Sequence, residues 1–116
     1  MSVLSFIRRT TLVLLTGLTS MSAFANPIWI DVRSVEEFNQ GHLPGALNII
    51  HTDIADKISA VTSDKTAEIQ LYCRSGRRSG LAMEALQKLG YTNVHNAGGY
   101  AELAAKQAKP AQNPQQ

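Results

Sequence analysis

Hydrophobic and polar stretches alternate regularly along residues 28–106. Four short apolar runs predict buried strands, at residues 28–32, 46–50, 69–73 and 92–95. Each run is followed by helix-start residues or by apolar residues at helical spacing. These predict helices at residues 34–40, 53–60, 79–89 and 100–106. A turn is predicted at residues 97–99, before the last helix. This alternation predicts an α/β fold: a short parallel sheet of about four strands, flanked by helices on both faces.

Residues 1–25 do not fit this pattern. Arg8 and Arg9 are followed by an uncharged, largely apolar stretch that ends in a small-x-small sequence at 23–25. These three features predict a secretory signal peptide cleaved after Ala25. The uncharged stretch is shorter than the roughly 20 apolar residues that cross a bilayer. We therefore expect an exported protein, periplasmic in a cell with two membranes, that is not held in the membrane after cleavage.

The rest of the chain has the composition of one small globular domain. Of the 116 residues, 44% are hydrophobic and 17% are charged, which excludes a disordered chain. Removing the signal peptide leaves equal numbers of basic and acidic residues, so a general attraction to nucleic acid is not expected. The domain is predicted over residues 26–107, as a monomer, with a disordered tail rich in Pro, Gln and Asn at 108–116.

A single cysteine, Cys73, ends the third predicted strand. It excludes an internal disulfide and a C-x-x-C redox pair. Three arginines lie within the next five positions, just before a predicted helix, although cations are unfavourable at the positive end of a helix. An anion bound there would resolve this conflict. The same positive charge should lower the pKa of Cys73, and Gly76 allows the loop to curl.

These residues carry a family resemblance. Residues 73–79 resemble the active-site loop C-x-x-G-x-R-[ST] of rhodanese-type sulfurtransferases. Residues 31–49 and 90–99 resemble two further motifs of that family, and together the motifs cover about residues 28–105 in the family's order. The resemblance implies the rhodanese fold. Many rhodanese domains begin with a further strand and helix, so a sheet shorter by one strand is expected here.

The resemblance also implies a chemistry and a set of residues. Cys73 would take the outer sulfur of thiosulfate as a persulfide and pass it to cyanide or a thiol. Arg78 would orient the anion and stabilise the persulfide. The residues implied to bind the substrate follow the cysteine directly: Arg74, Ser75, Gly76 and Arg77. No cofactor is required.

Other polar residues are assigned supporting roles or none. Asp31 and Arg33 end the first predicted strand and are expected to support the loop structurally, with Glu37 as a candidate partner of Arg33. Three scattered histidines and no nearby carboxylate pair give no metal site.

Two other functions remain open from the sequence. A non-catalytic module could bind a persulfide or an anion through the same fold. A cysteine-dependent phosphatase or arsenate reductase would use a similar loop, but with five residues between cysteine and arginine, whereas four separate Cys73 from Arg78.

Overall fold

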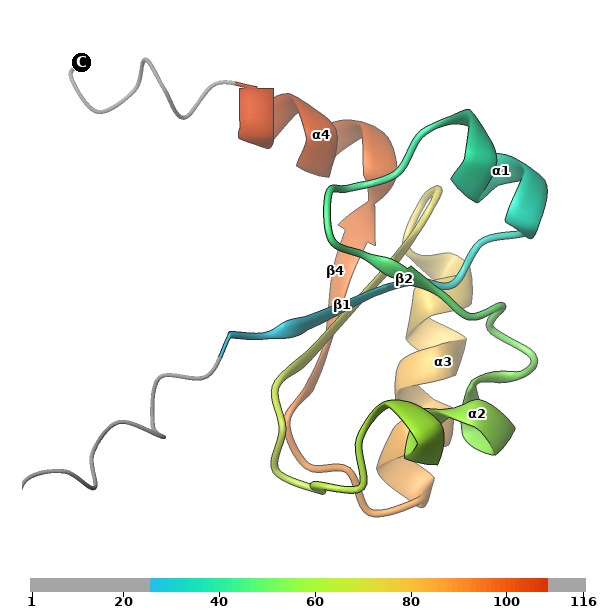
Figure 1. Cartoon of the computed structure of the whole chain (residues 1–116), viewed down its shortest axis with the longest axis vertical. Coiled ribbons are helices and arrows are strands. Elements are labelled where there is room, and N and C mark those ends of the chain that lie inside the picture. The colour runs from blue at the N-terminus through green and yellow to red at the C-terminus, as the bar shows by residue number, and fades with distance from the viewer. Residues whose placement is uncertain (1–25, 109–116) are drawn as a thin grey trace, which may run out of the picture.

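A computed structural model describes residues 26–108, and the predicted signal peptide lies outside this range. The described part contains four strands and four helices in strict alternation (Figure 1). In chain order they are β1 (Ile28–Asp31), α1 (Val35–Gln40), β2 (Leu47–Asn48), α2 (Ile54–Val61), β3 (Ile69–Cys73), α3 (Arg77–Lys88), β4 (Val94–Gly99) and α4 (Tyr100–Ala108). The α/β fold predicted from the sequence is confirmed.

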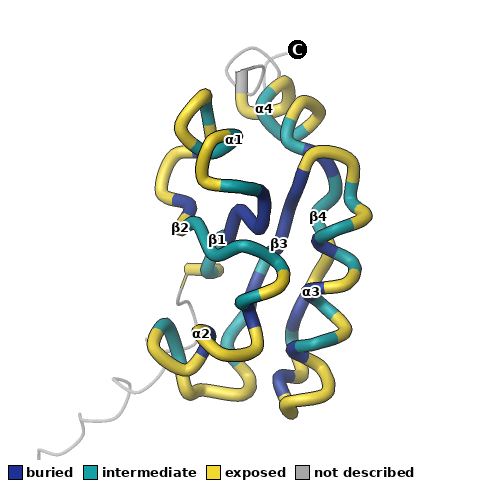
Figure 2. Tube along the Cα trace, turned by 90° about the vertical axis from the view of Figure 1, so that its right-hand side faces the viewer, coloured by how far each residue is buried: buried dark blue, intermediate teal, exposed yellow. Residues whose placement is uncertain are grey.

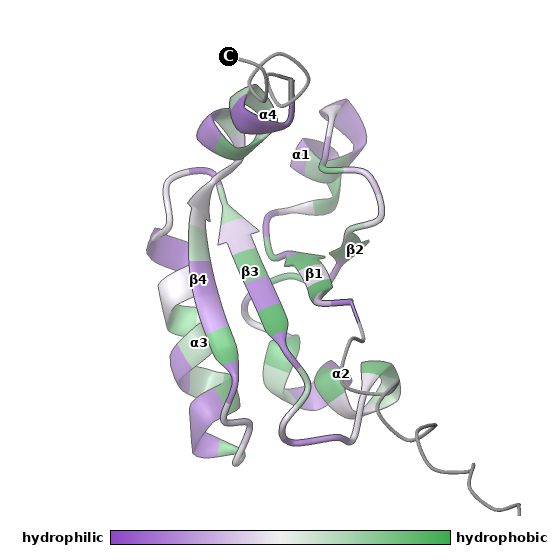
Figure 3. Ribbon diagram, turned by 90° about the vertical axis from the view of Figure 1, so that its left-hand side faces the viewer, coloured by the Kyte–Doolittle hydropathy of each residue, from purple (hydrophilic) through white to green (hydrophobic). Residues whose placement is uncertain are grey.

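The four strands form one parallel sheet in the order β2-β1-β3-β4. The central strand β3 pairs with β1 on one side and with β4 on the other. Because all strands run the same way, their carboxyl ends meet at one end of the sheet, where α1 and α4 also lie (Figure 3). In open parallel sheets this is the end at which functional residues gather.

Two hydrophobic clusters lie on opposite faces of the sheet. The larger cluster joins alternate residues of β1 and β3 to buried residues of α2 and α3, including Ile54, Ile58 and Leu86. The smaller one packs Tyr72 of β3 with the segment before β2 and with residues of α4. The trace is therefore most buried along β3, between these layers (Figure 2). Helices on both faces, as predicted, fix the positions of the strand ends.

The last strand departs from the prediction. Residues 97–99 were expected to form a turn, but they belong to β4, which continues to Gly99. A register shift leaves Ala97 without a partner opposite β3, and Gly98 adopts a left-handed φ of 103°. At Gly99 a Cβ atom would come within 2.5 Å of the Arg74 carbonyl oxygen. These glycines therefore allow β4 to run on, past a bulge, directly against the segment that follows Cys73.

Other element boundaries also differ from the prediction. Helix α3 begins at Arg77, whereas the sequence placed its start at residue 79. Strand β2 keeps only Leu47–Asn48 of the predicted 46–50, because the chain pairs with β1 for two residues and then turns toward α2. Ala108, the first residue of the predicted tail, is the last residue of α4.

Candidate active site

The cysteine loop, residues 73–78, leads from β3 into the first turn of α3. Cys73 is fully buried, and the backbone N–H of Gly76 donates a hydrogen bond to its Sγ at 3.0 Å. Gly76 has a left-handed φ of 97°, a conformation that glycine adopts without steric cost and that turns this N–H back toward the sulfur. The Ser79 hydroxyl lies 3.5 Å from the same sulfur. The loop therefore surrounds a nucleophilic atom with hydrogen-bond donors.

These donors change the acidity of the thiol. Burial, the largest single influence, raises the pKa of Cys73. The Ser79 hydroxyl and the backbone N–H groups of Ser79, Ser75 and Gly76 act in the opposite direction and together hold the pKa below its ordinary value. The direction is the one expected from the sequence, although hydrogen bonds, rather than the coulombic interaction between Arg78 and Cys73, are the leading causes that lower it. A lowered pKa increases the thiolate fraction, which is the nucleophilic form.

A side-chain network at the end of β4 holds the loop in place. The Ser79 hydroxyl donates to Oδ1 of Asn96 at 2.6 Å, and Nδ2 of Asn96 donates to the Gly76 carbonyl at 2.9 Å. The N–H of Gly98 donates to the same Oδ1 at 3.1 Å. A hydroxyl carries one proton, so Ser79 donates either to Asn96 or to the sulfur of Cys73.

Sequence reasoning placed Ser79 in the loop motif without a role of its own, and it did not single out Asn96. One signal was present: Asn96 directly follows the fourth predicted strand, and functional residues gather at the carboxyl ends of parallel strands. Because the predicted strand stopped at residue 95, the asparagine fell outside it.

Arg78 forms an ion pair with Glu37 of α1. Its two terminal nitrogens lie 2.8 and 3.1 Å from the two carboxylate oxygens, in a bidentate arrangement. Glu37 also accepts from the N–H of Ser34, in a capping box that begins α1. Hydrogen bonding from Arg78 is the main reason that the pKa of Glu37 falls to about 2. A carboxylate of the protein itself therefore offsets one of the three arginine charges that the sequence analysis matched to a bound anion.

The expected pairing of Arg33 with Glu37 is wrong. Arg33 pairs instead with Asp31, whose carboxylate accepts from Nε at 2.9 Å and from Nη2 at 2.6 Å. Both side chains are buried. The two residues are two positions apart at the end of β1, so their side chains point the same way. The Arg33 guanidinium also lies 4.6 Å from the centre of the Tyr100 ring, which places it under the first residue of α4.

The remaining predicted residues all lie on the cysteine loop. The side chains of Arg74, Ser75 and Arg77 are exposed, and Gly76 is half-buried. Arg77 stands in the first turn of α3. The structure therefore places the predicted loop residues directly after Cys73, with Asp31 at the end of the neighbouring strand β1 and Arg33 two residues beyond it.

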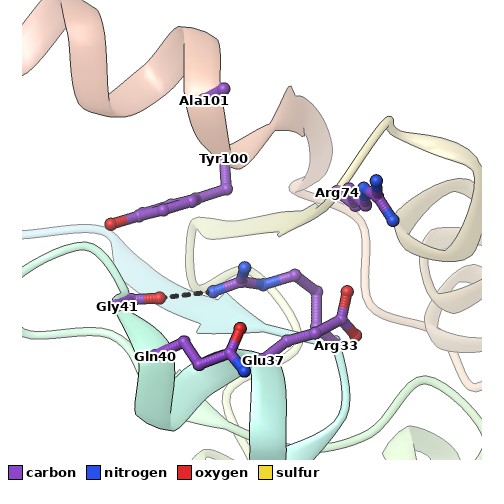
Figure 4. A pocket seen from close by; sticks show the side chains of 7 residues that line it. All are labelled: Arg33, Glu37, Gln40, Gly41, Arg74, Tyr100 and Ala101. Carbon is purple, nitrogen blue, oxygen red and sulfur yellow. Dashed lines mark hydrogen bonds between the residues drawn. The ribbon is translucent and has the colours of Figure 1, made fainter.

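A cavity of about 460 Å³ opens beside the cysteine loop. In Figure 4 the Tyr100 ring lies above the Arg33 guanidinium, and Arg74 stands across from them. The lining residues come from the end of β1, from α1, from the loop and from the start of α4: Arg33, Glu37, Gln40, Gly41, Arg74, Tyr100 and Ala101. The cavity thus reaches to the residue that follows Cys73. Within residues 26–108, no group of three or more His, Cys, Asp or Glu side chains is arranged to hold a metal ion.

Comparison with known proteins identifies the class to which this fold and site belong. The Rhodanese-like domain model matches residues 16–106. The chain therefore belongs to the rhodanese-like family of sulfurtransferases. The thiosulfate sulfurtransferase PspE of Escherichia coli K12 is 41% identical over 90 residues, which cover 78% of this chain and 86% of that protein.

Solved structures agree with this assignment. A structure described as rhodanese with anions from E. coli superposes with a TM-score of 0.64 at 42% identity, covering 66% of this chain and 91% of that one. A human single-domain sulfurtransferase, TSTD1, superposes with a TM-score of 0.60 at 31% identity, covering 69% of this chain and 82% of that one.

Proposed function

We propose that the protein is a thiosulfate sulfurtransferase that carries sulfur as a persulfide on Cys73. One observation carries the proposal: a thiol of lowered pKa, at the carboxyl end of a parallel strand, receives hydrogen bonds from the loop that follows it. The E. coli relative, which is named a thiosulfate sulfurtransferase, supports the same donor. The loop length disfavours a phosphatase, since four residues rather than five separate Cys73 from Arg78.

The reaction consists of two displacements. In the first, the Cys73 thiolate attacks the outer sulfur of thiosulfate, the sulfur–sulfur bond of thiosulfate breaks, and sulfite leaves with the electron pair. In the second, cyanide or a thiolate attacks the outer sulfur of the persulfide, and the Cys73 thiolate returns. The N–H groups that now face the thiol would stabilise the negative charge of both forms.

The arginines have different roles in this scheme. Arg78, held by Glu37, would orient the thiosulfate anion and stabilise the persulfide. Arg74 and Arg77 are exposed at the loop and would attract the dianion and the departing sulfite. Ser75 and Gly76 would contribute backbone N–H groups. Because Cys73 is fully buried, the loop would move outward for thiosulfate to reach the sulfur.

Export forms part of the proposal. Residues 1–25 have the pattern of a signal peptide cleaved after Ala25, and the protein would then act outside the cytoplasm as a monomer. Among residues 26–108, no helix is both long and apolar enough to span a membrane. Mass measurement of the protein recovered from the periplasmic fraction tests the cleavage position.

The intact mass of the mature protein, before and after thiosulfate, tests the sulfur chemistry. We expect a gain of one sulfur atom, which cyanide removes and which a Cys73→Ser variant lacks. If thiosulfate adds no sulfur while the thiol still reacts readily with iodoacetamide, the donor is wrong. If the thiol is also unreactive, a non-catalytic binding module accounts better for the fold.

A further inference from the structure

The cavity beside the cysteine loop is lined by the guanidinium of Arg33, and not all of its hydrogen-bond donors are used by the protein. Arg33 donates from Nε and Nη2 to Asp31, and from Nη2 to the Gly41 carbonyl at 2.7 Å. Its other terminal nitrogen, Nη1, has no hydrogen-bond partner among residues 26–108. In this part of the chain His51 Nδ1 is the one side-chain nitrogen or oxygen that is both buried and unpartnered, so Nη1 keeps some access to the cavity that Arg33 lines.

Arg33 itself is a rigid and buried part of the structure. Its side chain is 6% exposed and packs beside the rings of Tyr72 and Tyr100, whose centres are 5.7 and 4.6 Å from the guanidinium carbon. Gly41 lies close to this stack, since a Cβ atom there would come within 3.0 Å of the Tyr100 hydroxyl. The open nitrogen is therefore held at a fixed place in the cavity wall, which suits recognition of an anion.

The charges around the cavity favour an anion as well. Asp31 offsets the charge of Arg33, and Glu37 is offset by Arg78. Arg74, which also lines the cavity, is exposed and has no ion-pair partner among residues 26–108. Counted over the lining side chains and their ion-pair partners, the cavity therefore combines a fixed donor with a net positive charge, while the nearby Glu102 carboxylate lies by Gly99, outside the lining.

The position of the cavity connects this anion site to sulfur transfer. Arg74 follows Cys73 directly, and Glu37 contacts the arginine of the same loop. The volume of about 460 Å³ exceeds what thiosulfate, with five heavy atoms, requires. A larger molecule would fit, with its anionic end in the cavity and its reacting atom at the loop.

We propose that this cavity binds the carboxylate of a small thiol, the acceptor that takes sulfur from the Cys73 persulfide. This inference rests on the proposed function. The acceptor thiol loses its proton to water, and its thiolate forms a bond with the outer sulfur of the persulfide. The bond between that sulfur and Cys73 breaks, and the electron pair stays on the Cys73 thiolate. The acceptor leaves as a persulfide, with no external oxidant or reductant.

A pair of matched thiols tests the proposal. The persulfide form is first prepared with thiosulfate, and its mass is then followed after adding 3-mercaptopropionate or its methyl ester. With rates expressed per thiolate, we expect the acid to react about fivefold faster than the ester, the effect of one moderately screened charge contact. Equal rates for the two thiols would overturn the proposal and leave the proposed function intact.

Variants at the cavity rim separate a binding site from a general charge effect. Gln40 is exposed at the end of α1, so Gln40→Glu should reduce the preference for the acid and Gln40→Lys should increase it. Gln87→Glu, the same charge change on an exposed residue of α3 outside the cavity, is the matched control. Ala101→Leu fills the cavity without a charge and should also reduce the preference. If Gln87→Glu changes the preference for the acid as much as Gln40→Glu does, the result contradicts a binding site in the cavity.

A binding measurement covers the case in which no persulfide forms. In Cys73→Ser protein, 3-(methylthio)propionate cannot react, and we expect it to shift the NMR signals of the Gln40 side-chain amide and the Gly41 backbone amide. Its methyl ester should shift them much less. Equal shifts for acid and ester, or no shifts, overturn the anion site independently of whether thiosulfate is the donor.

Discussion

Two arginine–carboxylate pairs flank the cysteine loop, and they differ in burial and in sequence separation. Asp31 and Arg33 are two residues apart and almost fully buried at the end of β1. Glu37 and Arg78 are 41 residues apart and about 30% exposed. The buried pair belongs to the frame of the sheet, whereas the exposed pair ties α1 to the loop that carries the thiol. The difference indicates that stability depends mainly on the first pair and activity on the second.

Replacing Asp31 should have the largest effect, because it leaves a buried guanidinium without its counter-charge. We expect Asp31→Asn to lower the free energy of unfolding by about 3 to 5 kcal/mol, measured by urea denaturation. Asp56→Asn, a charge removal at an exposed position of α2, serves as the control and should cost less than about 0.5 kcal/mol. Similar losses of unfolding free energy in both variants would contradict the view that the buried pair, more than other charges, stabilises the fold.

Replacing Glu37 should affect activity more than stability. In Glu37→Gln, Arg78 loses its bidentate partner and samples many side-chain rotamers. We expect kcat/KM for thiosulfate to fall about tenfold and stability to fall by about 1 to 2 kcal/mol. Glu36→Gln removes the same charge from the neighbouring, exposed position of α1 and should preserve the activity.

A double variant sharpens this result. If Glu37 acts through Arg78, Glu37→Gln should have little further effect on kcat/KM in an Arg78→Gln background. Additive losses would mean that the two side chains act separately. A rise in kcat/KM for Glu37→Gln alone would mean that the carboxylate restrains Arg78 instead of positioning it.

Much of the frame could be predicted from the sequence, because it depends on local patterns. Strand β3 was predicted with its observed bounds, since four of its five residues are apolar or aromatic and polar segments stand on both sides. The start of α1 was predicted to within one residue, because Ser34 is a residue type that caps helices; in the structure it forms a capping box with Glu37. Residues 97–99 were predicted wrongly as a turn. Their glycines instead allow a bulge and a close backbone contact with Arg74.

The partners within the site were harder to predict. Cys73 and its loop follow from one contiguous segment, but the carboxylate that binds Arg78 is 41 residues away. Sequence spacing favoured Glu37 as the partner of Arg33, which is four residues before it, whereas the alternation of β1 directs Arg33 to Asp31. Asn96 meets the loop only through the pairing of β4 with β3. Contacts of this kind depend on strand order, which a single sequence does not specify.

Acid should weaken the exposed pair within a defined range. The pKa of Glu37 falls from 4.5 to about 2, mainly through Arg78. A carboxyl whose pKa is lower in the folded than in the unfolded protein stabilises the fold above its unfolded pKa and ceases to do so as pH falls through its folded pKa. The difference in unfolding free energy between the wild type and Glu37→Gln should therefore be constant above about pH 4.5 and disappear toward about pH 2. A difference that does not change with pH would contradict the ion pair.

The smallest expected effect is on the pKa of the Cys73 thiol. It tests the hydrogen-bond donors around the sulfur without changing either ion pair. The Ser79 hydroxyl lies 3.5 Å from the sulfur of Cys73 and 2.6 Å from Oδ1 of Asn96. Ser79→Ala removes a donor from the thiolate, so the pKa of Cys73 should rise and alkylation by iodoacetamide at a fixed, mildly acidic pH should slow by a small factor.

Asn96→Ala should act in the opposite direction. Without its close acceptor, the Ser79 hydroxyl is free to donate to the sulfur of Cys73, so the pKa should fall further and alkylation should become faster. Ser75→Ala is the matched control, because this exposed side chain makes no hydrogen bond among the described residues and its backbone N–H remains. Changes of the same sign in Ser79→Ala and Asn96→Ala would show that the two residues act through loop position rather than through competition for one proton.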